Sequence, residues 1–420
     1  MIMIRTITVI PWDNCSQFWA YPTEDNAGKS DKPAHSMAVA GAEPELNSRR
    51  CVLLLSRLPK RSCAEEEWLQ FVREAVDWAG KQNYTIVSSV GMMGWEYVTW
   101  YAANRGIPIW IVLPPDRLSG TLGNIESIIS RLELEETRAS CLQPLSEGNL
   151  PKAYIMHLRD RVTFNLAHER MPIALRKGSS WNRLTQNAVG VNRQFETKYP
   201  VRSKPGWVNL KEGCSNPLED TGVEYLIHWT RGVYGPWPGE SHADYFRELT
   251  NTNTGNPRDG YNTLNQIVMS GVIRGEGRMI REGEPTISFT ASAPAETMKR
   301  LSYRAALGHW NYEPYGIAIP KSLLADIGAK PVIYGDNDRF EELNVEEKPY
   351  FQFSGRNTSQ TGQNDTPPEK NWVTENEWRL IGDFDFSSIS EHIFLLLPNR
   401  SEAEQMGHET GYKALALSGK

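Results

Sequence analysis

Two glutamates and an arginine near the C-terminus are the residues of this sequence best suited to act on a substrate. Glu375, Glu377 and Arg379 alternate within residues 372–381, a stretch rich in β-forming residues. Because successive side chains of a strand point to opposite faces, all three share one face. Two carboxylates on one face repel each other, so the arrangement favours either a solvated edge strand or a polar pocket in which a substrate uses one carboxylate. The residues alone leave both interpretations open.

Polar side chains also end two predicted strands upstream. Residues 225–230 are predicted to form a strand that ends in His228 and Thr230, and residues 285–290 a strand that ends in Ser288 and Thr290. Between these strands, the apolar spacing predicts one helix that stops at Gly271. A histidine or hydroxyl at a strand end is more often structural than functional. These residues therefore indicate a functional site only in combination with Glu377.

In this order, the His-x-Thr strand, the helix with its glycine, the Ser-Phe-Thr strand and the late Glu-Trp-Arg-Leu segment resemble the ADP-ribosyltransferase fold. More narrowly, they resemble the DarT group of nucleic-acid ADP-ribosyltransferases. Residues 312–319 and 331–335 are also similar to the AbiGi group of phage-abortive proteins. The resemblance implies an α+β domain of a phage-defence protein that takes NAD as its substrate and needs no metal.

The same resemblance implies roles for individual residues. Cleavage of the nicotinamide–ribose bond passes through an oxocarbenium-like state, which a carboxylate stabilises. Glu377 and His228 would be the catalytic residues, with Glu377 as this carboxylate and His228 as a hydrogen-bond partner of the ribose. Arg379 would either neutralise a carboxylate or hold the NAD pyrophosphate. The other residues expected to contact NAD are Thr230 at the nicotinamide amide, Ser288 and Thr290 at the pocket wall, and Tyr315 against the nicotinamide ring or a base.

The N-terminal half alternates short apolar segments with amphipathic ones. Strands are predicted over residues 51–57, 84–88 and 107–113, and helices over 64–81 and 94–106. This alternation predicts a doubly wound parallel sheet of the Rossmann-like type. Residues 22–49 are rich in Pro, Gly, Ser, Asn and Asp, and they are predicted to form a long loop.

A glycine-containing turn over residues 88–96 follows the second of these strands. Glycines there allow a ligand to approach the backbone, and the amides that begin the next helix can bind phosphate. The turn resembles the SMF/DprA-LOG superfamily, as do residues 55–57, 158–167, 174–180 and 205–213, although Glu96 replaces a shorter acid. The resemblance implies a site for a nucleotide or single-stranded DNA formed by Ser56, Arg57, Ser89, Gly91, Gly94, Arg159, Arg161, Lys177 and Ser179.

Charge and cysteine content narrow the class of protein. The net charge of the 420 residues is −6, yet residues 151–212 hold twelve Lys or Arg against four Asp or Glu, a local excess of eight positive charges. Such a zone suggests an anionic partner, or else a solvated surface. Five scattered cysteines without Cys-x-x-Cys spacing argue against disulfides and zinc. No apolar run is long enough to span a bilayer, so we expect a cytoplasmic protein without a membrane partner.

The length predicts two domains. We expect a nucleotide- or nucleic-acid-binding domain over 1–213, a linker over 214–222 and the ADP-ribosyltransferase-like domain over 223–420. Three hypotheses remain: a two-domain defence enzyme that transfers ADP-ribose or hydrolyses NAD, a DprA-like single-stranded DNA-binding protein with an accessory domain, and a structural protein with two degenerate pockets. NAD turnover and salt-dependent DNA binding distinguish them. The sequence leaves the oligomeric state open, a homo-oligomer included.

Overall fold

The computed structural model describes residues 8–11, 36–58, 66–115, 121–135, 137–145, 152–200, 205–251, 258–277, 280–304, 309–354 and 376–418. Glu375 lies outside the described residues. Within the described ranges, no helix is long and apolar enough to cross a membrane.

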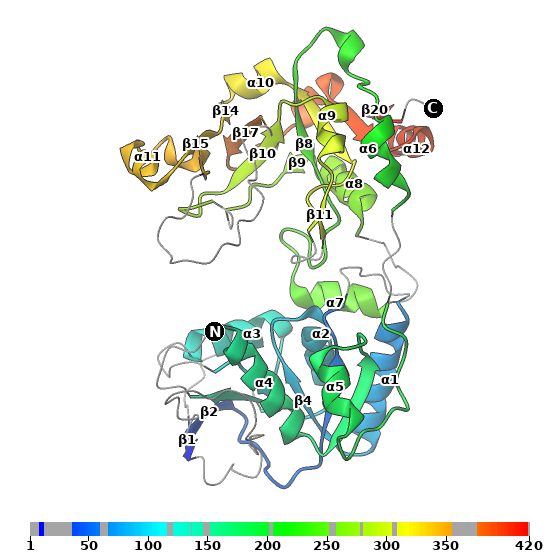
Figure 1. The fold of residues 1–420 in the computed structure, drawn as a ribbon, viewed down its shortest axis with the longest axis vertical. Helices are drawn as coiled ribbons and strands as arrows, with labels where there is room; N and C mark the ends of the chain where they lie inside the picture. The colour runs from blue at the N-terminus through cyan, green and yellow to red at the C-terminus, as the bar shows by residue number, and fades with distance from the viewer. Residues whose placement is uncertain are drawn as a thin grey trace. The chain divides into compact units, whose positions relative to one another are not determined.

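The chain divides into two compact units. The N-terminal unit comprises Met1–Arg202 and Gly235–Asn256, and the C-terminal unit comprises Ser203–Tyr234 and Pro257–Lys420. The segment predicted as a linker therefore falls inside the C-terminal unit, because Leu210 and Leu218 pack in one apolar cluster with Ile227 and other strand residues of that unit. Both units combine helices with a mixed sheet, so the predicted α/β class is confirmed at this level (Figure 1).

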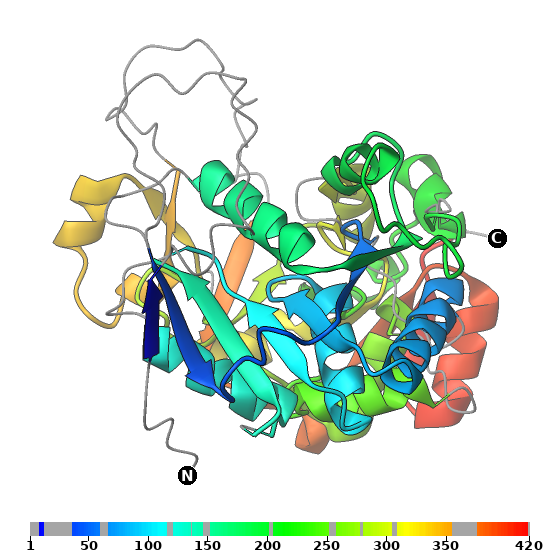
Figure 2. The same ribbon diagram turned by 90° about the horizontal axis from the view of Figure 1, so that it is seen from below.

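A seven-stranded sheet with the order β1-β2-β6-β5-β4-β3-β7 forms the centre of the N-terminal unit. Strands β3 to β7 are mutually parallel, and β1 and β2 add an antiparallel edge, which Figure 2 shows in dark blue. The strands are β1 (Thr8–Pro11), β2 (Ser36–Gly41), β3 (Arg50–Leu55), β4 (Thr85–Ser89), β5 (Ile109–Val112), β6 (Ala139–Pro144) and β7 (Glu169–Ala174). The loop prediction was wrong at β2, where the small apolar residues of Ser-Met-Ala-Val-Ala-Gly pair with β6.

Helices cover both faces of this sheet, which explains why β3 is buried along its whole length. Leu53 packs in one cluster with α1, α2 and α3, whereas Leu54 packs in another with α4 and α5. The helices are α1 (Glu67–Lys81), α2 (Met93–Asn104), α3 (Thr121–Leu132), α4 (Lys152–Leu166), α5 (Ser180–Gln186) and α7 (His242–Thr250). Helix α7 joins this unit although its residues follow the first strand of the other.

The C-terminal unit is built on a second seven-stranded sheet, with the order β14-β17-β10-β8-β13-β19-β20. Its strands are β8 (Tyr225–Trp229), β10 (Thr286–Thr290), β13 (Gly316–Pro320), β14 (Lys330–Pro331), β17 (Glu377–Ile381), β19 (Phe394–Leu397) and β20 (Lys413–Ala416). All neighbours are antiparallel except β19 and β20. The short pairs are β9 (Val272–Ile273) with β18 (Phe384–Asp385), β11 (Tyr303–Arg304) with β12 (His309–Trp310), and β15 (Ile333–Gly335) with β16 (Phe351–Phe353).

The helices of this unit are α6 (Leu210–Gly213), α8 (Gly260–Ser270), α9 (Pro294–Lys299), α10 (Lys321–Asp326), α11 (Asn337–Glu342) and α12 (Arg400–Thr410). The predicted glycine stop is confirmed at α8, where Gly271 adopts a left-handed backbone conformation with φ +67°. The side chain of Asp259 caps the other end of α8 by accepting a hydrogen bond from the amide of Asn262.

Candidate functional site

Ser288, Thr290, Glu377 and Arg379 share one face of the C-terminal sheet. Strands β10 and β17 pair so that Thr290 lies opposite Glu377 and Ser288 lies opposite Arg379. Residues directly opposite each other in an antiparallel pair project to the same side. The structure therefore brings together four of the residues that the sequence assigned to catalysis and NAD binding.

The carboxylate of Glu377 is held at one of its two oxygens. The Ser288 hydroxyl donates to Oε1 over 2.8 Å, and Arg379 Nε donates to the same oxygen over 3.0 Å. No residue of the described ranges donates to Oε2. The Glu377 side chain keeps 13% of its surface exposed and Ser288 is exposed, so the free oxygen belongs to a carboxylate that solvent or a ligand can reach.

Arg379 anchors this carboxylate from the interior. Only 3% of its side chain is exposed, and beyond Glu377 it donates to the carbonyls of Pro349 and Phe351 and to the side-chain oxygen of Gln352. Four of its five N–H groups are thus used within the protein. Of the two predicted roles, the structure favours neutralisation of a carboxylate over contact with a pyrophosphate.

His228 approaches the same strand β10 from its other neighbour, β8. Its Nδ1 lies 2.9 Å from the carbonyl oxygen of Ser288, a contact that needs the proton on Nδ1. Its ring packs edge-on against Phe289, and alternation along β8 gives it the face of Leu226 in the apolar cluster. Ser288 therefore contacts both predicted catalytic residues, but the side chains of His228 and Glu377 leave the sheet on opposite faces.

Acidification is expected to destabilise the C-terminal unit through His228. Burial lowers the pKa of this imidazole below its ordinary value, although its hydrogen bond to Ser288 opposes the shift. Below about pH 6.5 this histidine is protonated in the unfolded chain but still neutral in the folded chain. The free energy of unfolding therefore falls by up to about 1.4 kcal/mol for each pH unit below 6.5. Urea unfolding of the wild type and of His228→Gln between pH 7.5 and 5 measures the difference. An equal loss in both proteins would contradict this assignment.

Thr230 and Tyr315 lie in the interior. The Thr230 hydroxyl donates to the carbonyl of Tyr315 over 3.0 Å, and the side chain is 4% exposed. Tyr315 is 6% exposed and belongs to the apolar core, and burial raises the pKa of its phenol. Thr290 is half-buried and accepts a hydrogen bond from the amide of Ser292. In this conformation Thr230 and Tyr315 hold the end of β8 and present no surface to a ligand.

In the N-terminal unit, the carboxyl ends of β3 and β7 bring two predicted residues together. The Ser56 hydroxyl donates to Ser179 Oγ over 3.1 Å and accepts from the backbone amide of Arg176 over 3.0 Å. Arg57 and Lys177, which flank these serines in the sequence, are exposed. Because β4 to β6 lie on one side of β3 and β7 lies on the other, this is the point at which the order of strands reverses.

The glycine-containing turn is occupied by the protein's own side chains. Ser89 is completely buried and donates to the carbonyl of Val112, so it does not face a ligand. The amide of Gly91 donates to Glu96 Oε1 over 3.2 Å, and Arg131 donates to the same oxygen over 2.9 Å. Glu96 therefore takes the position at the start of α2 where a phosphate was expected. Gly94 serves packing, because a Cβ there would lie 3.3 Å from Leu55.

Arg159 and Arg161 also have partners within the protein. Arg159 is 7% exposed, donates to the carbonyl of Val90 and to Asp160, and lies over the ring of Trp95 at 4.5 Å. Arg161 donates to the ring nitrogen Nε2 of His157. Arg159 therefore stabilises the turn over residues 88–96 and does not face an anion.

No family model matches this chain. A search of curated proteins also finds no match. Among the residues that the structure describes, no group of three or more His, Cys, Asp or Glu side chains could hold a metal ion. Sequence reasoning missed Pro349, Phe351 and Gln352, which orient Arg379. These residues lie 27 to 30 positions from Arg379 in the sequence. Pro349 and Phe351 also act through their backbone carbonyls, which leave no signal in the sequence.

Proposed function

We propose that the C-terminal unit breaks the nicotinamide–ribose bond of NAD, with Glu377 as the catalytic carboxylate. The observation that carries the proposal is how this carboxylate is held: Ser288 and Arg379 donate to Oε1, and no donor among the described residues reaches Oε2. Three of the four segments on which the resemblance to ADP-ribosyltransferases rests form neighbouring strands, β17, β10 and β8. Of these strands, β17 and β10 place Glu377, Arg379, Ser288 and Thr290 on one face, which supports a common site there.

In the proposed reaction, the C–N bond between ribose and nicotinamide breaks and its electron pair leaves with nicotinamide. The ribose carbon gains positive charge, which the negative carboxylate of Glu377 stabilises. The hydroxyl or amine of an acceptor, or a water molecule, then bonds to this carbon and gives its proton to Oε2. Arg379 and Ser288 act as positioning residues that keep the carboxylate oriented throughout.

Exchange of Glu377 for glutamine tests this proposal. The amide keeps the shape of the side chain but removes its charge and its ability to accept a proton, so we expect nicotinamide release from NAD to fall by about 100-fold. The assay compares purified wild type, Glu377→Gln and the control Glu391→Gln, whose side chain is 81% exposed in the same unit. Unchanged turnover in Glu377→Gln, or no release by the wild type with or without single-stranded DNA, would refute the proposal.

A second candidate function, binding of a nucleotide or nucleic acid by the N-terminal unit, is supported by the meeting of Ser56 and Ser179 beside exposed Arg57 and Lys177. In the assay above, the arm with single-stranded DNA addresses it. An affinity of the protein for single-stranded DNA that falls steeply with salt concentration supports this function, because phosphates that the protein neutralises release counterions. A dependence of NAD turnover on the DNA would join both functions in one protein.

A further inference from the structure

The side chain of Gln352 lies beside the carboxylate of Glu377. Arg379 donates from Nε to Glu377 Oε1 over 3.0 Å and from Nη2 to Gln352 Oε1 over 2.7 Å. Both nitrogens are bonded to the same carbon of one planar guanidinium group, so the two oxygens that accept from them are neighbours. A single arginine, whose side chain is 3% exposed, thus holds a carboxylate and a carboxamide side by side.

The contact with Arg379 also fixes which way the carboxamide of Gln352 points. Arginine has only N–H donors, so the amide oxygen must face Arg379 and the NH₂ group must face away from it. No described residue accepts a hydrogen bond from this NH₂ group, and both Gln352 and Glu377 are only half-buried. The site therefore presents an unused donor, Gln352 Nε2, next to the unused acceptor Glu377 Oε2.

A hydroxyl group of a ligand matches this pair of atoms. A hydroxyl accepts one hydrogen bond and donates another, so it uses the amide and the carboxylate together. A phosphate would accept from the amide but would be repelled by the carboxylate, and an ammonium group would pair with the carboxylate but could not accept from the amide. The pair therefore favours a hydroxyl over either charged group.

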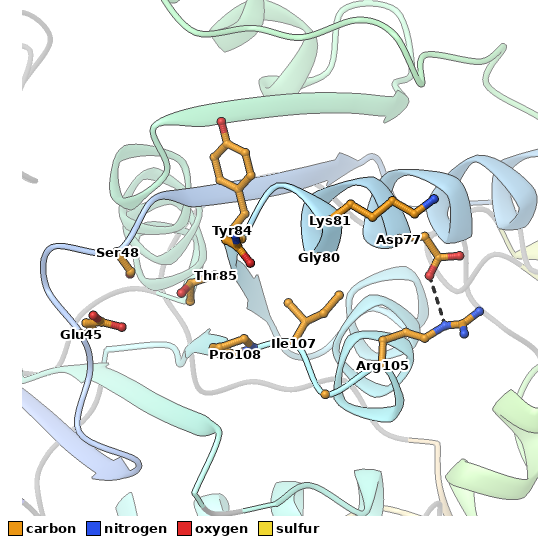
Figure 3. A pocket seen from close by; sticks show the side chains of 12 residues that line it. Glu45, Ser48, Asp77, Gly80, Lys81, Tyr84, Thr85, Arg105, Ile107 and Pro108 are labelled. Carbon is orange, nitrogen blue, oxygen red and sulfur yellow. Dashed lines mark ion pairs between the residues drawn. The ribbon is translucent and has the colours of Figure 1, made fainter.

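The N-terminal cavity of about 690 Å³ at the amino ends of β4 and β5 differs from this arrangement (Figure 3). On its wall, Asp77 and Arg105 pair with each other over 3.1 Å, and Glu45 lies on the far side of the cavity from them. The apolar side chains of Tyr84 and Ile107 are 3% and 6% exposed. Among its described side chains, the cavity thus shows no unused donor held next to an unused acceptor.

We infer that Gln352 Nε2 donates to the 2′-hydroxyl of the nicotinamide ribose of NAD, while this hydroxyl donates to Glu377 Oε2. The inference rests on the proposed action on NAD, in which Glu377 lies next to the ribose carbon that loses nicotinamide; the 2′-hydroxyl is on the adjacent carbon. A carboxylate oxygen accepts more than one hydrogen bond, so Oε2 still receives the proton of the attacking group. Gln352 is then a specificity-determining residue that favours a ribosyl substrate over its 2′-deoxy analogue.

Steady-state kinetics of the full chain test this role with NAD and with two analogues, which lack the 2′- or the 3′-hydroxyl of the nicotinamide ribose. The measured quantity is kcat/KM for NAD divided by kcat/KM for each analogue. Gln352→Glu keeps an oxygen for Arg379 but loses the donor, and Gln352→Leu loses the donor without adding a charge. In both variants we expect the 2′ ratio to fall about tenfold below that of the wild type, as for the loss of one hydrogen bond, and the 3′ ratio to stay unchanged. The intrinsic reactivity of each substrate cancels, because each ratio is compared between proteins.

Matched controls are Gln405→Glu and Gln405→Leu, in which an exposed glutamine of α12 is replaced and both ratios should stay at the wild-type value. An unchanged 2′ ratio in either Gln352 variant, or an equal fall of the 2′ and 3′ ratios, would overturn the inference while cleavage of NAD stood. Circular dichroism verifies that each variant is folded.

The proposed cleavage and the inferred contact can fail separately. If the wild type does not cleave NAD, the proposed function fails, and isothermal titration of the same proteins with the same three ligands gives the ratios as affinities. A preference for the 2′-hydroxyl that disappears in both Gln352 variants would then still support the contact. Equal affinity of the wild type for NAD and its 2′-deoxy analogue would overturn it.

Discussion

Replacing Phe246 by alanine is expected to lower the free energy of unfolding of the N-terminal unit by about 3–5 kcal/mol. Phe246 lies in α7 and is 1% exposed. Its ring centre is 5.6 Å from that of Tyr97 and 5.7 Å from that of Trp100, both in α2. Removal of the ring leaves a cavity among large aromatic side chains, and α7 loses its ring contacts with Tyr97 and Trp100 of α2.

The informative feature of this prediction is which unit responds. Residues 235–256 follow β8 in the sequence, yet they belong to the N-terminal unit. Differential scanning calorimetry with separate transitions should therefore show the N-terminal unit shifted by Phe246→Ala. The control Phe289→Ala removes a ring that is 2% exposed in the core of the C-terminal unit and should shift that transition instead. A shift of the C-terminal unit alone by Phe246→Ala would contradict the assignment of α7.

Replacing Arg379 by methionine is expected to destabilise the C-terminal unit by about 3–5 kcal/mol, because the carboxylate of Glu377 would remain without its charged partner. The carbonyls of Pro349 and Phe351 would lose their donor at the same time. Urea unfolding followed by circular dichroism measures the loss. Glu377 is itself only 13% exposed, so water compensates the lost ion pair only in part.

Two further variants separate this effect from a general one. Arg400 pairs with Glu404 one helical turn away and is 80% exposed, so Arg400→Met should change stability by no more than about 0.5 kcal/mol. The double variant Arg379→Met/Glu377→Gln has no uncompensated charge, and it should be more stable than Arg379→Met alone. If the double variant were as unstable as the sum of its parts, the ion pair would not be the source of the loss.

Local patterns were sufficient for several elements. The uninterrupted apolar run at residues 51–55 predicted β3, because a strand buried on both faces is apolar throughout. The helical spacing of apolar residues before Lys81 predicted α1, because a helix buried on one face repeats its apolar residues every three to four positions. The alternation of Glu377 with Arg379 placed both on one face, and the register of β17 agrees. Strand β2 was not predicted because most of its residues are small, and Met37 and Val39 are its only larger apolar residues.

The sequence by itself thus determined which residues form strands and helices in much of the chain, and that Glu377 and Arg379 lie on one face, since these properties depend on neighbours two to four residues away. Only the tertiary structure decided that α7 joins the other unit, that Glu96 fills the start of α2, and that His228 and Glu377 leave their sheet on opposite faces. Each of these depends on partners distant in sequence: the aromatic surface of α2, the amide of Gly91 held by its turn, and the pairing of β8 with β10. Such contacts form when packing brings separate elements together, and short-range periodicity carries no record of them.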